Sequence, residues 1–244
     1  MPVLYHLLML FACFAITTAK AQATIDDSSF VETSIAYTKS FHKTIAAENL
    51  GLYSGVVYDM HYAAQKGHPY FLNDQLKEST IVYNGFQYEH VPLLYDLVND
   101  KVLIESYDHL HNLQLVDNRV SSFRIGDHSF VRLQPDTVQG TLMPTGFYEI
   151  LHGGKLIALA RHEKKLLQEA RGETLESRFK PYDYYFIFFK DHYYSVASNT
   201  SLLDVFGKQK ADVRAYLHKN KLNFKHDPEQ TIAKACIYYE QLTR

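Results

Sequence analysis

The stretch TIVYNGFQYEHVPLLYDLVNDKVLIES, from Thr80 to Ser106, decides the fold of this chain. Within it, Asn84-Gly85 separates two runs in which apolar and polar residues alternate, as they do in strands that bury one face. A two-residue hairpin turn of type I′ needs a positive φ at both central residues, and Asn-Gly supplies this readily. The stretch therefore predicts an antiparallel meander, which continues through a polar turn at Asn99-Asp100 into a strand at residues 102–104.

The turn also predicts which residues pair across the first hairpin. With Tyr83 opposite Phe86, Ile81 lies opposite Tyr88, so an aromatic ring packs against a β-branched side chain on one face. Further pairs of short alternating runs, joined by residues typical of turns, cover residues 120–125 with 129–133, 146–151 with 156–160, and 184–189 with 193–196. Short strands at this spacing are typical of antiparallel proteins rather than of alternating β-α units.

Four other segments complete the expected fold. A capping-box pattern that begins at Ser29 predicts a helix to about residue 49, and residues 52–62 predict a further strand. Residues 161–180, RHEKKLLQEARGETLESRFK, interleave Glu with basic residues and predict an exposed crossover with some helix. The tail from Ser198 predicts helices, the last of which starts at Asp227-Pro228, with Asp as the cap and Pro in the first turn.

We therefore expect a mainly β (α+β) fold. An antiparallel meander forms a curved sheet or an open barrel, and an N-terminal helix and C-terminal helices pack on it. Residues 1–21 are expected to be a signal peptide. Residues 22–244 are expected to form a single β-rich domain whose helical segment covers about residues 198–244.

The first residues predict export from the cytoplasm. Residues 7–16 form an apolar run, and Ala19-Lys20-Ala21 follows with the small-x-small pattern of a signal-peptide cleavage site. This run is too short to span a bilayer and no later apolar run is longer, so we expect no transmembrane segment in the mature chain. The expected location is secreted or periplasmic. The alternative is an outer-membrane lipoprotein anchored through Cys13, because residues 10–13 resemble a lipidation box.

Charge and motifs exclude several classes of function. Lys and Arg number 25 against 27 Asp and Glu, so the net charge is −2 and nucleic acid is not an expected partner. The sequence has no Gly-x-Ser-x-Gly elbow and no glycine-rich phosphate loop. Cys236 lies on the apolar stripe of the last helix and is expected to be an inert core thiol. We therefore assign no catalytic residue and no cofactor.

Histidines are frequent, at 13, and the strongest metal-site candidate among them is Asp108-His109-x-His111. On a strand, residues two apart share a face, so His109 and His111 could bind one metal ion with Asp108 nearby. The alternative places all three residues in a solvent-exposed turn, because no third His ligand is identified by spacing.

Four tyrosines crowd one predicted hairpin: Tyr184, Tyr185, Tyr193 and Tyr194. Alternation places Tyr184 on one face and Tyr185 on the other, so one row of rings is expected to stay exposed. Exposed tyrosines bind ligands or partner proteins, since each ring is apolar and each hydroxyl is polar. The alternative is that they cover a sheet face that is in contact with water.

Several phrases together suggest a relationship: LYSGVVY at 52–58, GHPYF at 67–71, VPLLYD at 91–96, GFYE at 146–149 and the tail at 202–217. They resemble a family of uncharacterised, secreted, β-rich proteins of Gram-negative cell envelopes, which has no assigned activity. The resemblance implies export and brings no catalytic residue.

The leading hypothesis is a secreted or periplasmic, non-enzymatic binding or interaction module of the cell envelope. Its partner is expected to be an envelope protein or a small apolar ligand, since curved sheets closed by a helix enclose apolar cavities in lipid carriers. The competing hypothesis is a metal-assisted hydrolase that uses His109 and His111.

Overall fold

The computed structural model describes residues 51–62, 66–134, 143–171 and 174–244, with the side chains of residues 171–175 excepted. Contacts divide the chain into Met1–Glu48 and Asn49–Arg244, and all of the described residues belong to the second unit. The predicted signal peptide, Cys13 and the helix predicted near residues 29–49 lie outside the described residues.

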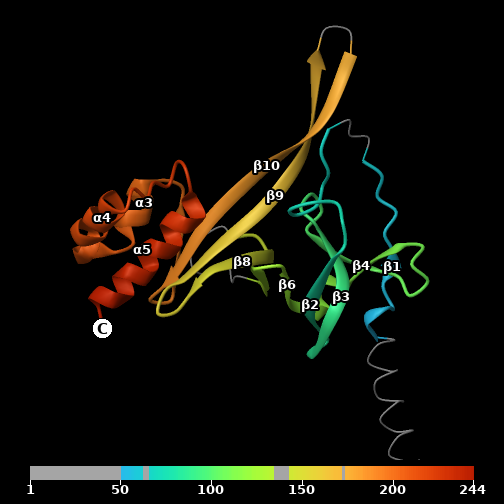
Figure 1. Ribbon diagram of the computed structural model, residues 1–244, viewed down its shortest axis with the longest axis horizontal. Coiled ribbons are helices and arrows are strands. Elements are labelled where there is room, and N and C mark those ends of the chain that lie inside the picture. The colour runs from blue at the N-terminus through green and yellow to red at the C-terminus, as the bar shows by residue number, and fades with distance from the viewer. Residues whose placement is uncertain (1–50, 63–65, 135–142, 172–173) are drawn as a thin grey trace, which may run out of the picture. The chain divides into compact units, whose positions relative to one another are not determined.

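Eleven strands in the described part of the chain form one antiparallel sheet (Figure 1), whose order is β1-β5-β4-β3-β2-β6-β7-β8-β9-β10-β11. The strands are β1 Val56–Val57, β2 Lys77–Tyr83, β3 Phe86–Asp96, β4 Lys101–Glu105, β5 Asn112–Gln114, β6 Val120–Ile125, β7 His128–Leu133, β8 Gly146–Gly153, β9 Ile157–Arg171, β10 Thr174–Phe189 and β11 His192–Val196. The sheet is open, because β1 and β11 form its two edges. The predicted mainly antiparallel β fold is confirmed.

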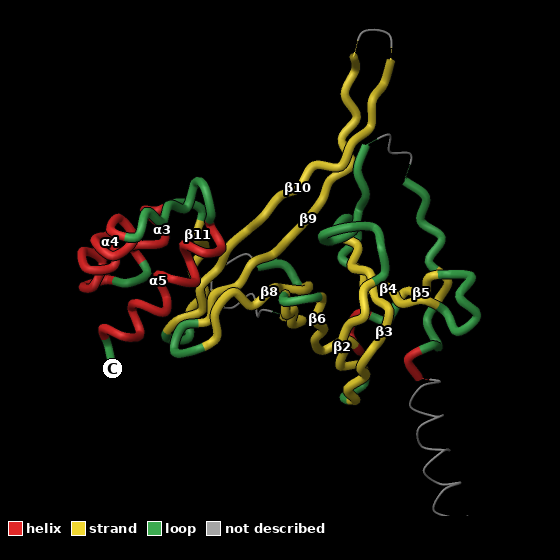
Figure 2. The backbone as a smooth tube through the Cα atoms, viewed as in Figure 1, coloured by secondary structure: helices red, strands yellow, loops and turns green. Residues whose placement is uncertain are grey.

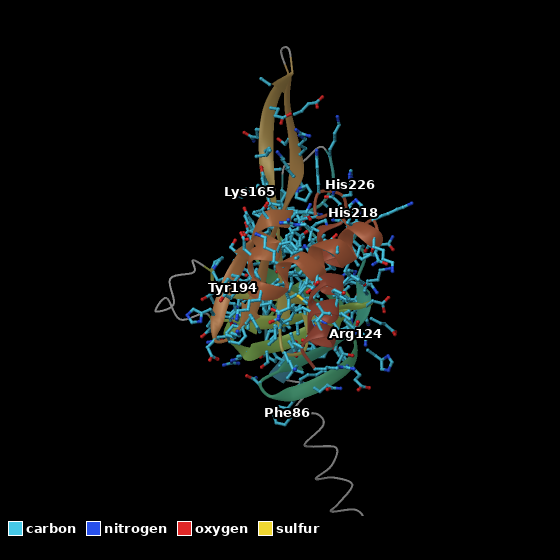
Figure 3. The ribbon with its side chains drawn as sticks, turned by 90° about the vertical axis from the view of Figure 1, so that its left-hand side faces the viewer. Phe86, Arg124, Lys165, Tyr194, His218 and His226 are labelled. Atoms are coloured by element: carbon cyan, nitrogen blue, oxygen red, sulfur yellow. The ribbon has the colours of Figure 1, made fainter. Side chains whose placement is uncertain are left out.

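The first hairpin has the turn and the register that the sequence predicts. Asn84 and Gly85 have φ values of 53° and 82°, which are the two positive angles of a type I′ turn. Tyr83 pairs with Phe86 and Ile81 with Tyr88. This register buries Ile81 and Tyr83 completely, whereas Phe86, labelled in Figure 3, stays half exposed at the end of the hairpin.

Helices follow the last strand, as predicted: α3 Asn199–Asp204, α4 Lys210–Lys219 and α5 Pro228–Leu242, with a short 3-10 turn, η3 Gly207–Gln209, between α3 and α4. Another 3-10 turn, η1 Asp117–Arg119, lies between β5 and β6. The Asp227 side chain caps α5 by accepting a hydrogen bond from the Gln230 backbone N–H at 3.0 Å. One stripe of α5, which includes Ile232 and Cys236, is fully buried with apolar residues of β9, β10 and β11. The helices therefore cover one face of the last strands (Figure 2).

That helix-covered face carries two apolar clusters. The first lies over β2 to β8 and includes Tyr95, Phe123, Phe130 and Phe147, whose rings contact one another. The second lies between the helices and β9 to β11. A smaller cluster around Tyr148 and Phe186 occupies the opposite face. Polar side chains on this face lie between the two apolar clusters.

Two predicted segments differ from the structure. The first is the exposed crossover with some helix that was predicted for residues 161–180: residues 161–171 belong instead to the long strand β9, and residues 174–180 to the long strand β10. Both faces of these strand ends carry charged side chains, so the apolar alternation that marks a half-buried strand is missing. The strand predicted over residues 52–62 is reduced to β1, which pairs with β5 through its two residues only.

Candidate functional site

Strands β9 and β10 continue as a two-stranded ribbon beyond β8 and β11 (Figure 1), and Lys66 forms an isolated bridge with Arg178 in this ribbon. Pairing of β8 with β9 reaches Ala160, and pairing of β11 with β10 reaches Tyr185. Pairing between β9 and β10 continues to Arg171 and Thr174. We call residues 161–171 and 174–184 the ribbon; at about 3.4 Å per residue it is about 35 Å long.

A group of ionisable side chains lies where the ribbon leaves the sheet, and we call it the root cluster. It consists of His128 on β7, Glu149 on β8, His162 on β9, Asp183 on β10 and Glu229 in the first turn of α5. His162 and Asp183 are direct cross-strand partners. Strand pairing therefore brings together residues that are far apart in the sequence.

His162 is the centre of the root cluster. Its Nε2 lies 2.8 Å from Oε2 of Glu149, and its Nδ1 lies 2.7 Å from Oδ1 of Asp183. The second carboxylate oxygen of Glu149, Oε1, lies 2.7 Å from Nδ1 of His128. His162 and Glu149 are only 8% and 6% exposed. The carboxylate of Glu149 is therefore held between two imidazole rings, away from most of the solvent.

The environment shifts the ionisation of three of these groups. Burial disfavours the charged imidazolium, but hydrogen bonds to Asp183 and Glu149 outweigh it and raise the pKa of His162 to about 9. Burial opposes ionisation of Glu149 as well, yet hydrogen bonds with His162 and His128 lower its pKa overall. Burial, together with the charges of Glu149 and Asp183, raises the pKa of Glu229. The cluster thus contains one carboxyl group with a lowered pKa, Glu149, beside an imidazole and a second carboxyl group with raised pKa values, His162 and Glu229.

Apolar side chains surround the root cluster. The Phe71 ring lies 5.0 Å from the His128 ring and 5.3 Å from the His162 ring, measured between centroids. Phe130, from the first apolar cluster, lies 6.3 Å from His162. Such surroundings exclude water and strengthen electrostatic interactions. Chemically, the root cluster can hold protons or a cation.

The predicted His-x-His site lies elsewhere. Asp108, His109 and His111 are all exposed and precede β5, so they occupy the turn that was the alternative to a strand. His109 has a φ of 58° and its Nδ1 lies 2.7 Å from Glu105. In the described part of the chain, the one group of three His, Cys, Asp or Glu residues with ligand atoms within 4.8 Å of one another is Glu149, His162 and Glu229.

The four tyrosines are divided between the two faces of the sheet. Tyr185 is buried against the C-terminal helices, where its ring contacts Phe224. Tyr194 pairs with Ile187, shares that face and is 38% exposed. Tyr184 is 41% exposed and lies on the opposite face, as alternation predicts. Tyr193 pairs with Phe188 on the same face as Tyr184.

A shallow pocket of about 320 Å³ lies at β2, β3 and β6, and its lining is polar: Glu78, Ser79, Thr80, Glu89, His90, Arg124 and Gly126. It adjoins a bulge in which Thr80 lies opposite two residues of β3, one of which, His90, has a φ of 57°.

Comparisons of the chain with protein-family models, with curated protein sequences and with solved structures found no match. No helix in the described residues has both the length and the apolar character needed to cross a membrane. The geometry of the ribbon and of the root cluster is therefore the basis for inference about function.

Sequence reasoning missed the root cluster. The sequence neighbour of His128 is Asp127, which is fully exposed and lies 3.6 Å from Arg124, whereas the partner of His128 is Glu149. The register of the hairpin that joins β9 to β10 would have paired His162 with Asp183. That register was hidden because residues 161–180 were interpreted as a crossover.

Proposed function

We propose that the protein is a non-enzymatic binding module that acts outside the cytoplasm, and that the ribbon contacts a partner protein. The observation that supports this most directly is the extension of β9 and β10 beyond their neighbours. A two-stranded ribbon is marginally stable by itself in water. A length of about 35 Å therefore adds little to the stability of the sheet and is better explained by what it presents to another molecule.

Like charges that face each other across the ribbon support the same conclusion. Lys165 lies directly opposite Lys180, and Glu169 lies directly opposite Glu176. Such pairs destabilise a hairpin by a few tenths of a kcal/mol or more. The ring of Tyr182 partly offsets the first pair, because the two lysine Nζ atoms lie 5.0 and 5.3 Å from its centroid. Glu169 is also paired with Arg178 at 2.6 Å and Glu176 with Lys66 at 3.3 Å. The lysine pair is therefore the part of this arrangement that favours contacts with a partner over the stability of the ribbon.

The root of the ribbon is fixed to the sheet. The backbone N–H of Lys164 donates to the Leu97 carbonyl at 3.0 Å. Its Nζ donates to the carbonyls of His68 and Tyr70 at 3.0 and 2.7 Å. Lys165, labelled in Figure 3, follows on the lower part of the ribbon. A surface that is held in place before binding loses less entropy when it binds.

An apolar ligand is the second candidate partner, and the structure gives less support for it than for a partner protein. The sheet is open, and its helix-covered face is filled by the two apolar clusters. A carrier would take up a fluorescent lipid and protect it from a water-soluble quencher. We expect no such protection.

The proposed location depends on residues 1–21. Their apolar run and Ala19-Lys20-Ala21 support export to the periplasm or the exterior of a cell envelope. N-terminal sequencing of protein from fractionated cells checks this, and we expect the mature chain to start near residue 22. An intact N-terminus in the cytoplasmic fraction would contradict it.

The partner is tested by site-specific photo-crosslinking in cells that produce the full chain. A crosslinking amino acid at Tyr184, which is 41% exposed at the root of the ribbon, is expected to give a discrete protein adduct. The same amino acid at Tyr107, an 86% exposed tyrosine in the turn before β5, is the matched control and is expected to give none. Charge reversal of Lys165 and Lys180 to Glu is expected to remove the adduct while thermal unfolding stays cooperative.

Three results would contradict the proposal. They are the absence of any adduct at Tyr184, equal adducts at Tyr184 and Tyr107, and an adduct that is unchanged by charge reversal of the two lysines. Protection of a fluorescent lipid would favour the apolar-ligand alternative instead.

A further inference from the structure

We infer that Glu149, His162 and Glu229 form a binding site for a divalent metal ion of the Zn²⁺ type, in which Asp183 orients the His162 ring. The inference concerns the root cluster and is independent of whether the ribbon binds a partner. It places a metal site at a different position from the exposed turn at His109 and His111.

The spacing of the ligand atoms fits such an ion. One nitrogen or oxygen from each of the three residues lies within 4.8 Å of the other two. Ligand atoms of a tetrahedral Zn²⁺ lie about 3.3 Å apart, given bonds of about 2.0 Å. Nε2 of His162 and Oε2 of Glu149 are already 2.8 Å apart. The carboxylate of Glu229, which is partly exposed, supplies the third ligand atom of the group.

The surroundings of His162 are those of a metal ligand. Its Nδ1 faces Asp183 at 2.7 Å, so the Nδ1–H can donate to the carboxylate and Nε2 is left with a lone pair for the metal. Carboxylate–histidine–metal arrangements of this kind fix the tautomer and raise the basicity of the ligand. His128 supports Glu149 in the same way, because it binds the carboxylate oxygen that Nε2 of His162 does not contact.

Charge favours a cation at this position. Glu149, Asp183 and Glu229 bring three carboxylates to a site in which Glu149 and His162 are buried, opposite the two imidazoles of His128 and His162. Without a metal, a proton on His162 balances part of this charge. A metal ion displaces that proton, so binding releases a proton and weakens as the pH falls.

The donor set narrows the choice of metal. One imidazole and two carboxylates match the N and O ligands of Zn²⁺, and Mn²⁺ is the next best fit. Ca²⁺ prefers six or more oxygen ligands, and Cu⁺ prefers sulfur. Glu229 belongs to α5 and the other two ligands to the sheet, so a bound ion would link the C-terminal helix to the root of the ribbon.

The test uses the full chain, stripped with EDTA, loaded with Zn²⁺ alone and dialysed at pH 8. Elemental analysis is expected to find about one Zn²⁺ per chain, and titration with Co²⁺ is expected to give the visible absorption of an N/O-ligated tetrahedral site. Glu229→Gln and Asp183→Asn are each expected to weaken binding roughly 10–100-fold. Neither substitution removes an apolar core residue, so circular dichroism can confirm that both variants fold.

Two control variants distinguish this site from other histidines. His152 and Glu240 form a partly buried pair at 3.2 Å that belongs to no group of three ligands in the described residues. Glu240→Gln is therefore expected to bind Zn²⁺ like the parent chain. The double substitution His109→Ala and His111→Ala is also expected to leave binding unchanged. Absence of retained metal in the parent chain, or parental affinity in Glu229→Gln, would overturn the inference.

Discussion

His162 is buried and has a carboxylate at each of its ring nitrogens. Removing an imidazolium from water is unfavourable, and in this position two charge-assisted hydrogen bonds more than offset the loss. Replacing one carboxylate with a neutral group would leave the other ions of the cluster less well balanced. The protonation state of the His162 ring therefore influences how firmly the root of the ribbon is held.

The raised pKa of His162 predicts a pH dependence of stability. Because the folded-state pKa is about 9 and the ordinary value is about 6.5, protonation stabilises the folded state. The contribution is fully present below pH 6.5 and is lost as the pH rises through 9, and its upper limit is about 3 kcal/mol. Urea unfolding in EDTA between pH 6 and 9.5 measures it. Asp183→Asn is expected to move the loss to lower pH, and an unchanged profile in that variant would contradict the explanation.

Gly85 carries a second prediction at the scale of one residue. Its φ of 82° is one that L-residues rarely adopt, so Gly85→Ala is expected to lower the free energy of unfolding by about 1 kcal/mol. Gly153→Ala is the control, because its φ is not positive and a new Cβ would meet its nearest atom at 4.0 Å. The control is expected to change stability by less than about 0.5 kcal/mol. Equal effects in urea unfolding would show that the turn is not under this constraint.

At the scale of elements, α5 joins the helices to the sheet through a single stripe. Its N-terminus was predictable, since Asp227 caps the helix and Pro228 occupies the first position. Its buried face includes Ile232, Ala235, Cys236 and Tyr239. Burial raises the pKa of the Cys236 thiol to about 12, so this thiol is an inert part of the core.

Two isoleucines of α5 test this packing. Ile232 is fully buried, and Ile232→Ala is expected to lower the free energy of unfolding by about 2–5 kcal/mol, because it leaves a cavity against the sheet. Ile237 is 37% exposed on the same helix, and Ile237→Ala is expected to cost less than about 1 kcal/mol. Chemical denaturation of both variants gives the comparison. Similar losses would mean that α5 does not pack through the Ile232 face.

The ribbon shows where sequence patterns fail to predict a strand. Hairpins that bury one face were predicted with the correct register, as Ile81 and Tyr88 show. In the ribbon, Lys, Glu and Arg interrupt the apolar alternation that indicates a strand. The pairing of β9 with β10 begins inside the sheet and continues without interruption into the ribbon. The local sequence of the ribbon does not reveal this continuation.

At the scale of the whole molecule, the antiparallel sheet and the C-terminal helices could be predicted because each depends on local patterns. The root cluster could not, because its members come from four strands and a helix. Its contacts depend on the register of three neighbouring strand pairs at once. An error of one residue in any pair would have turned Glu149 or His162 to the other face.

The order of the strands has a consequence for how the chain folds. All strand pairs except β1 with β5 and β2 with β6 join strands that are consecutive in the sequence. Contacts of short sequence separation form fast, because little loop-closure entropy is lost before they form. We therefore expect the chain to assemble hairpin by hairpin. The pairs of β1 with β5 and of β2 with β6 enclose the intervening strands of the meander, so we expect these two pairings to form last.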